Sequence, residues 1–287
     1  MTLAGILILA IGVTSTRGAS ALGPAPQRPL RIASLNLCAD ELVLRLLDRD
    51  RIVSVTFLAA DPAASNVADL ARGVPLNRGL AEEIIPLKPD LVITGAFTTQ
   101  AATAMLRLFG VPVLELSIPE TLDQAYEQIR QVAARVGEAE RGERLIAAMK
   151  AGLAGLADPQ GPKRTAIVLR PNGFTAGKGS LVDDLMSRAG LVNLAARLPR
   201  DKFGQLALEE VVVAHPDLLI VDSGRDAPPS LAQALLKHPA LAALDRDGHI
   251  LSVPGRFMGC PGPELVTAAR RLAGLPDEPA PKAQASP

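Results

Sequence analysis

The residues of this chain that could support catalysis or metal binding are few and scattered. Its three histidines, His215, His238 and His249, never occur at the spacing of zinc ligands. The segment GFTAGKGS resembles a phosphate-binding loop, but only three residues separate Gly173 from Gly177, where four are needed. No G-x-S-x-G elbow is present, and no G-x-G-x-x-G follows the first predicted strand. We therefore expect no catalytic residues, no metal site and no cofactor, and a protein that is not an enzyme.

Two pairs of adjacent carboxylates, Asp40-Glu41 and Asp183-Asp184, stand near the starts of predicted helices. Negative charge at that position complements the positive end of the helix dipole, and we favour this interpretation over catalysis. Ser180 precedes Asp183 by three residues, which predicts a helix N-cap with an acidic third position.

Aromatic residues are rare and gather after predicted strands. The chain has six Phe, one Tyr and no Trp. Phe57, Phe97, Phe174 and Phe257 each follow a short apolar run, whereas Phe109 is expected in the core. Ligands of open α/β sheets bind just beyond the carboxyl ends of the strands. The four rings therefore predict the walls of a ligand cleft, with core packing as the alternative.

Arginines share these loops, namely Arg170, Arg225 and Arg256. A guanidinium binds carboxylates and other oxyanions through paired N–H donors. Because loop arginines are usually only solvated, we expect at least one of the three to have no binding role. Rings and arginines together favour a large, partly flat ligand that carries anionic oxygens.

The two cysteines, Cys38 and Cys260, follow the first predicted strand and the last predicted loop, and each precedes a predicted helix. An even number of cysteines in an exported protein permits a disulfide, which here would join the two halves of the molecule. Thiols that line the ligand site and a pair that binds a soft metal are the alternatives, and the sequence leaves them open.

A twelve-residue segment occurs twice in the chain. EEIIPLKPDLVI starts at residue 82 and EEVVVAHPDLLI starts at residue 209, with six of the twelve positions identical. We expect each copy to form a short helix with Glu-Glu at its start, a Pro-Asp step that ends the helix, and a buried strand.

Short runs rich in Val, Ile and Leu alternate with amphipathic segments, which predicts βα units and mainly parallel sheets. The predicted strands are 32–35, 52–57, 91–94, 111–116, 166–169, 218–221 and 250–253. Helical spacing over 122–136 and 139–156 predicts two linking helices that act as a stiff strut. The expected fold class is α/β. Two Rossmann-like lobes, residues 30–118 and 163–275, would be joined by helices within 119–158 and would enclose a ligand cleft.

The composition and the two ends of the chain limit the kinds of protein that this sequence can encode. Lys+Arg and Asp+Glu number 30 each, so nucleic-acid binding, which needs a basic surplus, is not expected. The apolar run 3–13, followed by Ala19-Ser20-Ala21, predicts a signal peptide over residues 1–21. An uncleaved apolar N-terminus is the alternative. Residues 276–287 are Pro-rich and polar, and we predict that they are disordered.

Taken together, the predicted signal, lobes, strut and repeat resemble the periplasmic substrate-binding proteins of ABC importers for metal chelates, the group that handles ferric siderophores, haem and cobalamin. The resemblance spans about residues 31–272 and is carried by RIASLNLCADELVLRL, GLAEEIIPLKPDLVITGAF, LALEEVVVAHPDLLIVDSG and PGRFMGCPGPELVTAARRLAG. It implies a periplasmic protein that captures an iron complex of siderophore or haem type and delivers it to a permease dimer with its ATPase at the membrane. The alternatives are a corrinoid-binding protein of the same class, an exported α/β enzyme, and a binding module that serves a sensor.

The resemblance also implies which residues meet the ligand and the permease. The ligand-binding residues would follow the strands, and they are Asn36, Cys38, Phe57, Phe97, Arg170, Asn172, Phe174, Arg225, Arg256, Phe257 and Cys260. One acidic residue of each lobe, Glu82 and Glu209 by motif position, would dock on basic residues of the permease. Glu83 and Glu210 are duplicated as well, so a shift of one residue stays open. The shortage of His and Tyr argues against direct ligation of haem iron, and the absence of Trp argues against the aromatic-rich clefts of cobalamin binders.

Overall fold

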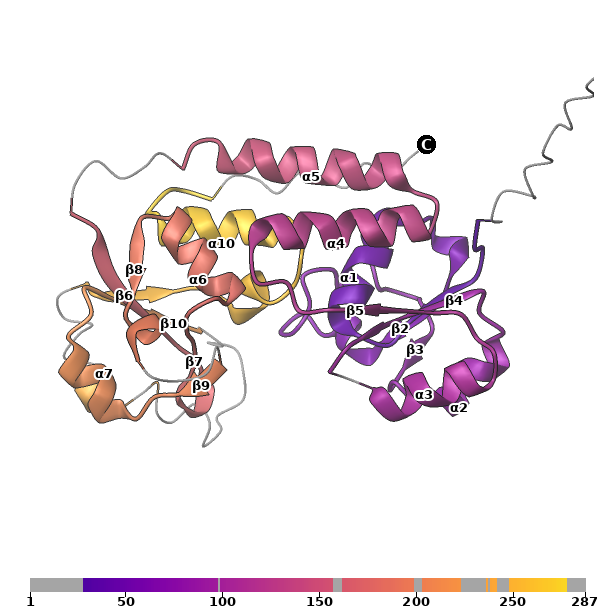
Figure 1. The fold of residues 1–287 in the computed structure, drawn as a ribbon, viewed down its shortest axis with the longest axis horizontal. Helices are drawn as coiled ribbons and strands as arrows, with labels where there is room; N and C mark the ends of the chain where they lie inside the picture. Colours follow the sequence, from indigo (N-terminus) through magenta and orange to yellow (C-terminus); the bar gives the residue numbers. More distant parts are fainter. Residues whose placement is uncertain are drawn as a thin grey trace, which may run out of the picture.

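The computed structural model describes residues 28–97, 99–156, 162–198, 203–222, 236, 238–241 and 248–277. The predicted signal peptide and most of the predicted disordered tail lie outside these residues, as do Thr98 and Arg225. Two separate parallel sheets form two lobes, which stand side by side beneath a pair of long helices (Figure 1). The predicted α/β class with two lobes is therefore confirmed.

The N-terminal lobe is built on a five-stranded parallel sheet with strand order β3-β2-β1-β4-β5. Its strands are β1 (Ile32–Ser34), β2 (Ile52–Thr56), β3 (Leu76–Asn77), β4 (Leu91–Gly95) and β5 (Val113–Leu116). β1 and β4 are buried at every residue, as expected for apolar strands covered on both faces. The lobe's helices are α1 (Leu37–Leu46), α2 (Ala81–Ile84) and α3 (Gln100–Leu108).

The C-terminal lobe has a four-stranded parallel sheet, in the order β11-β10-β6-β8, and a small antiparallel pair, β7-β9. Its strands are β6 (Arg164–Leu169), β7 (Phe174–Ala176), β8 (Leu191–Asn193), β9 (Phe203–Gln205), β10 (Leu218–Val221) and β11 (Ile250–Ser252). Its helices are α6 (Leu181–Arg188), α7 (Leu208–Ala214) and α10 (Glu264–Leu272). Ser180 caps α6, because its hydroxyl accepts a hydrogen bond from the backbone N–H of Asp183 at 3.2 Å, as the sequence predicts.

Two antiparallel helices, α4 (Leu122–Arg135) and α5 (Ala139–Leu153), link the lobes where the sequence predicts them. The start of α4 is tied to the C-terminal lobe, since Asp184 of α6 accepts a hydrogen bond from Leu122 N at 2.9 Å. The end of α4 is tied to the N-terminal lobe, since the buried Arg51 guanidinium donates to Val136 O at 2.6 Å. Both lobes and both helices contribute to one continuous apolar core.

The repeated segment has the same structural role in both lobes. Each copy forms a short helix and a buried strand, α2 and β4 in one lobe and α7 and β10 in the other. Asp90 accepts hydrogen bonds from the backbone N–H groups of Leu30 and Arg31, both at 2.9 Å. Asp217 accepts one from Thr165 N at 2.7 Å. In each lobe the Pro-Asp carboxylate therefore holds the start of the first strand next to the strand that follows the repeat.

Candidate functional site

Three strands of the N-terminal lobe bring polar and aromatic residues to one edge of the sheet. β1, β2 and β4 run parallel, and Asn36, Phe57 and Phe97 follow their carboxyl ends. Phe57 is 53% exposed and Phe97 is 73% exposed, so neither ring is used in the core. The side chain of Asn36 caps α1 by accepting hydrogen bonds from Cys38 N at 3.0 Å and Ala39 N at 3.3 Å.

The C-terminal lobe presents a second pair of exposed rings. Phe174 on β7 is 47% exposed, and Phe203 on β9 is 52% exposed. The register pairs Phe174 with Gln205 and Ala176 with Phe203, which places both rings on one face of the β7-β9 ribbon as diagonal neighbours. The loop between β6 and β7 is a tight turn in which Asn172 and Gly173 have left-handed backbone conformations.

Sequence reasoning did not select Phe203. At the spacing of the repeat Phe203 corresponds to Leu76 of β3, but residues 203–208 share no identical position with residues 76–81, so the repeat does not point to it. Both side chains are about half exposed, each just ahead of its glutamate helix. The prediction that Phe109 lies in the core was wrong. It lies beyond the last turn of α3, as the C-cap, and is 61% exposed rather than in the core.

Phe257 has different surroundings from the four open rings. It lies in the short helical turn Gly255–Met258 and packs partly buried against the main core. The guanidinium groups of Arg256 and Arg271 stand 4.9 and 5.1 Å from its ring centre. This ring therefore binds two cations of its own chain, and Arg256 is held at the same turn.

Arg170 follows the end of β6 and is part-buried. Its Nε is buried and has no hydrogen-bond partner. Burial lowers the pKa of the Arg170 guanidinium, and the nearby Asp222 carboxylate partly offsets this effect. A part-buried guanidinium can bind an anionic oxygen through its N–H donors. Arg225 lies outside the described residues.

The lobes touch at a contact that we call the lobe junction, formed by Cys38, Glu41, Arg45 and Asn66 of one lobe and Arg256, Cys260 and Glu264 of the other. Cys38 and Cys260 are joined by a disulfide, with their Cα atoms 5.0 Å apart. Of the alternatives that the sequence leaves open for the cysteines, the structure has the disulfide. The bond lies at the amino end of α1, next to the loop that contains Arg256.

The two glutamates of each repeat have different surroundings. Glu83 accepts a hydrogen bond from Arg78 N at 2.6 Å, and Glu210 accepts one from Ala207 N at 2.8 Å. The second glutamate of each pair therefore closes the start of its own helix. Glu82 and Glu209 are exposed on α2 and α7. These two helices lie on the side of the molecule opposite α4 and α5 (Figure 1).

The histidines and the tyrosine have structural positions. Tyr126 is 5% exposed on α4, and His215 is the left-handed C-cap of α7. His249 Nδ1 is 2.9 Å from Asp217 O, at the amino end of β11, and His238 Nδ1 accepts from Ala240 N. In the part of the chain that the structure describes, no group of three or more His, Cys, Asp or Glu side chains could hold a metal ion.

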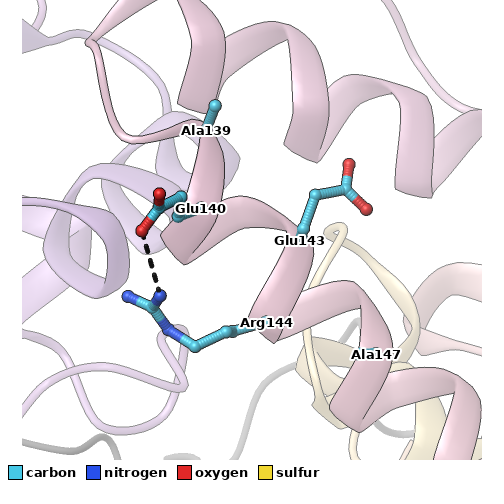
Figure 2. A pocket seen from close by; sticks show the side chains of 5 residues that line it. All are labelled: Ala139, Glu140, Glu143, Arg144 and Ala147. Carbon is cyan, nitrogen blue, oxygen red and sulfur yellow. Dashed lines mark ion pairs between the residues drawn. The ribbon is translucent and has the colours of Figure 1, made fainter.

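A shallow hollow lies on the outer face of α5, lined by Ala139, Glu140, Glu143, Arg144 and Ala147 (Figure 2). Its charged side chains are a solvated helix face, with Arg144 paired to Glu140 at 3.7 Å. It lies on α5, on the side of the molecule opposite α2 and α7 (Figure 1). We therefore take the residues that follow the strands of the two lobes, and not this hollow, as the candidate site.

A family model described as periplasmic binding protein matches residues 32–246. The chain belongs to this family. None of the described helices has the length and apolar character needed to cross a bilayer. No curated protein matches the sequence.

Several solved structures are similar to this binding protein. The periplasmic haem-binding protein RhuT from Roseiflexus sp. RS-1, in apo form, is 28% identical, with 85% of this chain and 98% of that chain covered and a TM-score of 0.68. An ABC-type Fe3+-hydroxamate transport protein from Saccharomonospora viridis is 24% identical, with 86% and 92% covered and a TM-score of 0.67. The vitamin B12-binding protein BtuF of Vibrio cholerae is 21% identical, with 87% and 97% covered and a TM-score of 0.67. The last two likenesses show the two-lobe fold alone.

Proposed function

We propose that this chain is a periplasmic solute-binding protein that captures an iron complex, of siderophore or haem type, and delivers it to the permease of an ABC importer. The observation that carries the proposal is the set of open rings, Phe57 and Phe97 beyond strands of the N-terminal lobe and Phe174 and Phe203 on the β7-β9 ribbon, together with the part-buried cation Arg170. Apolar rings cover the flat or hydrocarbon faces of a chelate, and a guanidinium holds one of its anionic oxygens. Family membership and the likeness to RhuT support a binding role rather than catalysis.

Within this ligand class, the positions of the His and Tyr residues favour complexes whose iron is already fully coordinated. Tyr126 is buried in the strut, and His249 is at the amino edge of its sheet. Neither can reach a ligand at the carboxyl edge. Such a complex would be held by contacts with its outer atoms, which is how the rings and Arg170 are able to act.

Thermal unfolding with a panel of compounds tests this function. The panel contains ferric hydroxamate, ferric catecholate, ferric citrate, haem and cobalamin. A ligand at a hundred times its Kd adds about 2.7 kcal/mol to the free energy of unfolding, which raises the Tm by several degrees. We expect one ferric siderophore class to raise the Tm. A higher Tm with cobalamin alone would contradict the proposal that the ligand is an iron complex. An unchanged Tm with every compound would favour the enzyme alternative.

We further propose that Glu82 and Glu209 dock the protein on basic residues of the permease dimer. Each is exposed, and each precedes a glutamate that is used to close its own helix. Matched charges on two lobes give register and electrostatic steering to a complex with a two-fold partner.

Iron uptake by cells that carry charge-reversed variants tests the docking role. Glu82→Lys and Glu209→Lys should each reduce uptake several-fold without changing ligand affinity. Glu127→Lys and Glu140→Lys, whose side chains are 74% and 95% exposed on the strut, are matched controls and should be neutral. Full uptake by the double variant Glu82→Lys/Glu209→Lys would favour a sensor partner instead.

A further inference from the structure

Three kinds of contact join the two lobes at the lobe junction. The disulfide links Cys38 to Cys260. Arg45 Nη2 is 2.7 Å from Glu264 Oε1, and both side chains are only about 15% exposed. Asn66 Nδ2 donates a hydrogen bond to Arg256 O at 2.9 Å. All three contacts connect the N-terminal lobe to the same segment of the C-terminal lobe, residues 256–264.

Asn66 is itself held firmly before it reaches across. Its backbone N–H and its Nδ2 both donate to Glu41 Oε1 at 3.0 Å. Glu41 belongs to α1 and is 1% exposed. An amide nitrogen has two hydrogens, so one is given to the carboxylate of its own lobe and the other to the carbonyl of the opposite lobe. The buried Glu41 carboxylate therefore orients the Asn66 amide toward Arg256 O of the opposite lobe.

The segment that Asn66 reaches is also anchored from its own side. Gly255 N donates to Asp222 Oδ1 at 2.8 Å. A Cβ at position 255 would stand 2.3 Å from Asp222 Oδ2, so a larger residue could not approach this carboxylate. The turn that carries Arg256 is thus tied to its own lobe at Gly255 and to the other lobe at Arg256 O and Cys260.

We propose that the lobe junction is a latch that fixes the turn 255–260 against the N-terminal lobe, and that Asn66 is a positioning residue for the ligand. This inference rests on the proposed function, because it assigns Asn66 and the disulfide an effect on the ligand through Arg256. The latch sets the distance between the lobes at the junction, so the relative position of their binding residues is set before the ligand arrives. A preformed site loses less conformational entropy on binding.

The polar contacts alone would make a weak latch. Arg45 Nε and Glu264 Oε2 are buried without a hydrogen-bond partner. Desolvation of such a pair offsets much of its Coulombic attraction. The disulfide adds a covalent link between the same segments. It therefore holds the lobes together where the Arg45–Glu264 ion pair contributes little.

Hydrogen–deuterium exchange of the ligand-free protein tests the latch without any knowledge of the ligand. Wild type is compared with Asn66→Ala, with Cys38→Ser/Cys260→Ser and with the triple variant. Wild type treated with dithiothreitol is a further sample, in which the disulfide accepts two electrons and two protons to give two thiols while the reagent becomes its cyclic disulfide. This sample avoids reliance on variants that fail to fold.

We expect exchange of the 255–262 amides to rise about tenfold in the Asn66 variant and further in the triple variant, while the amides of β1 and β6 keep their protection. Gln131→Ala, at an exposed position of α4 away from the junction, is the control and should leave residues 255–262 unchanged. Unchanged exchange in the reduced wild type and in Asn66→Ala would overturn the latch. An equal rise in every element would show general destabilisation and would also overturn it.

Ligand binding then separates the latch from the proposed function. The compound of the panel that raises the Tm of wild type is titrated into the Asn66→Ala variant, where we expect at least a fivefold weaker Kd. A faster-exchanging turn with an unchanged Kd would overturn the positioning role. If no compound binds wild type, the proposed function fails, while the exchange result still stands for the latch.

Discussion

At the scale of single residues, the buried Asp40 is the clearest source of pH dependence. Its carboxylate is fully buried and accepts hydrogen bonds from Thr56 N at 3.1 Å and from the Thr56 hydroxyl. Burial raises the pKa of Asp40 from 3.8 to about 6, although the hydrogen bonds of Thr56 and Ser34 oppose the rise. This residue therefore does more than complement a helix dipole, since it joins α1 to the end of β2.

A raised pKa in the folded state means that the folded protein binds this proton more tightly than the unfolded chain. The free energy of unfolding should therefore fall as the pH rises from 3.8 to about 6, by on the order of 3 kcal/mol from this group. Burial also raises the pKa of Glu41, which adds to the same slope. Asp40→Asn should flatten the profile in urea unfolding at several pH values. The exposed Asp50→Asn is the control, and equal slopes in all three proteins would contradict the assignment.

Replacement of Arg170 should change the stability of the ligand-free protein and its ligand binding in opposite directions. Burial without a full set of partners costs the folded protein free energy, so Arg170→Met should raise the Tm of the ligand-free protein. The same change removes the cation proposed to bind an anionic oxygen, so the ligand-induced Tm shift should shrink. Arg197→Met, at an exposed position of the same lobe, should change neither quantity. A lower Tm for Arg170→Met would show that the cation is structural.

At the scale of elements, the sequence predicted most of the fold because its signals are local. The apolar runs of β1, β2, β4, β5, β6, β10 and β11 and the periodicity of α4 and α5 needed no tertiary information. The short strands β3, β7, β8 and β9 were not predicted, because their two or three residues do not belong to a longer run rich in Val, Ile and Leu, as those of β1 and β11 do. The same reason explains why Phe203 was missed.

The choice between neighbouring glutamates also needed the structure. Both pairs are duplicated in the sequence, and only the hydrogen bonds from Arg78 N and Ala207 N separate a helix-closing glutamate from an exposed one. The cysteine pairing likewise depended on the distance between the lobes, which no local pattern encodes.

The contact between α4 and α5 gives a prediction at this scale. A Cβ at Gly142 of α5 would stand 2.5 Å from the Cβ of Ala133 on α4. Helix propensity favours Ala over Gly by about 1 kcal/mol, but this clash forces the helices apart and should cost about 1–3 kcal/mol. We therefore expect Gly142→Ala to be destabilising in urea unfolding. Adding Ala133→Gly removes the opposing methyl group and should restore much of the loss, and a stabilising Gly142→Ala would contradict the close packing.

At the scale of the whole molecule, the lobes should unfold together. One apolar core includes residues of both sheets and of the strut, and the lobe junction adds a covalent link. We expect a single calorimetric transition for the oxidised protein. The chain-entropy model assigns about 5 kcal/mol to a disulfide that closes a loop this long, so reduction should lower the Tm markedly. Two separate transitions in the oxidised protein would show that the lobes are independent.

The disulfide also changes what a break in the backbone would do. Residues 38 and 260 enclose every described strand except β1, together with the whole α4-α5 hairpin, so this part of the chain is a closed covalent ring. A protease that cut once at the turn around Gly137 would therefore release no fragment. The two pieces would migrate as one species on a non-reducing gel and would separate only when a reductant opened the ring.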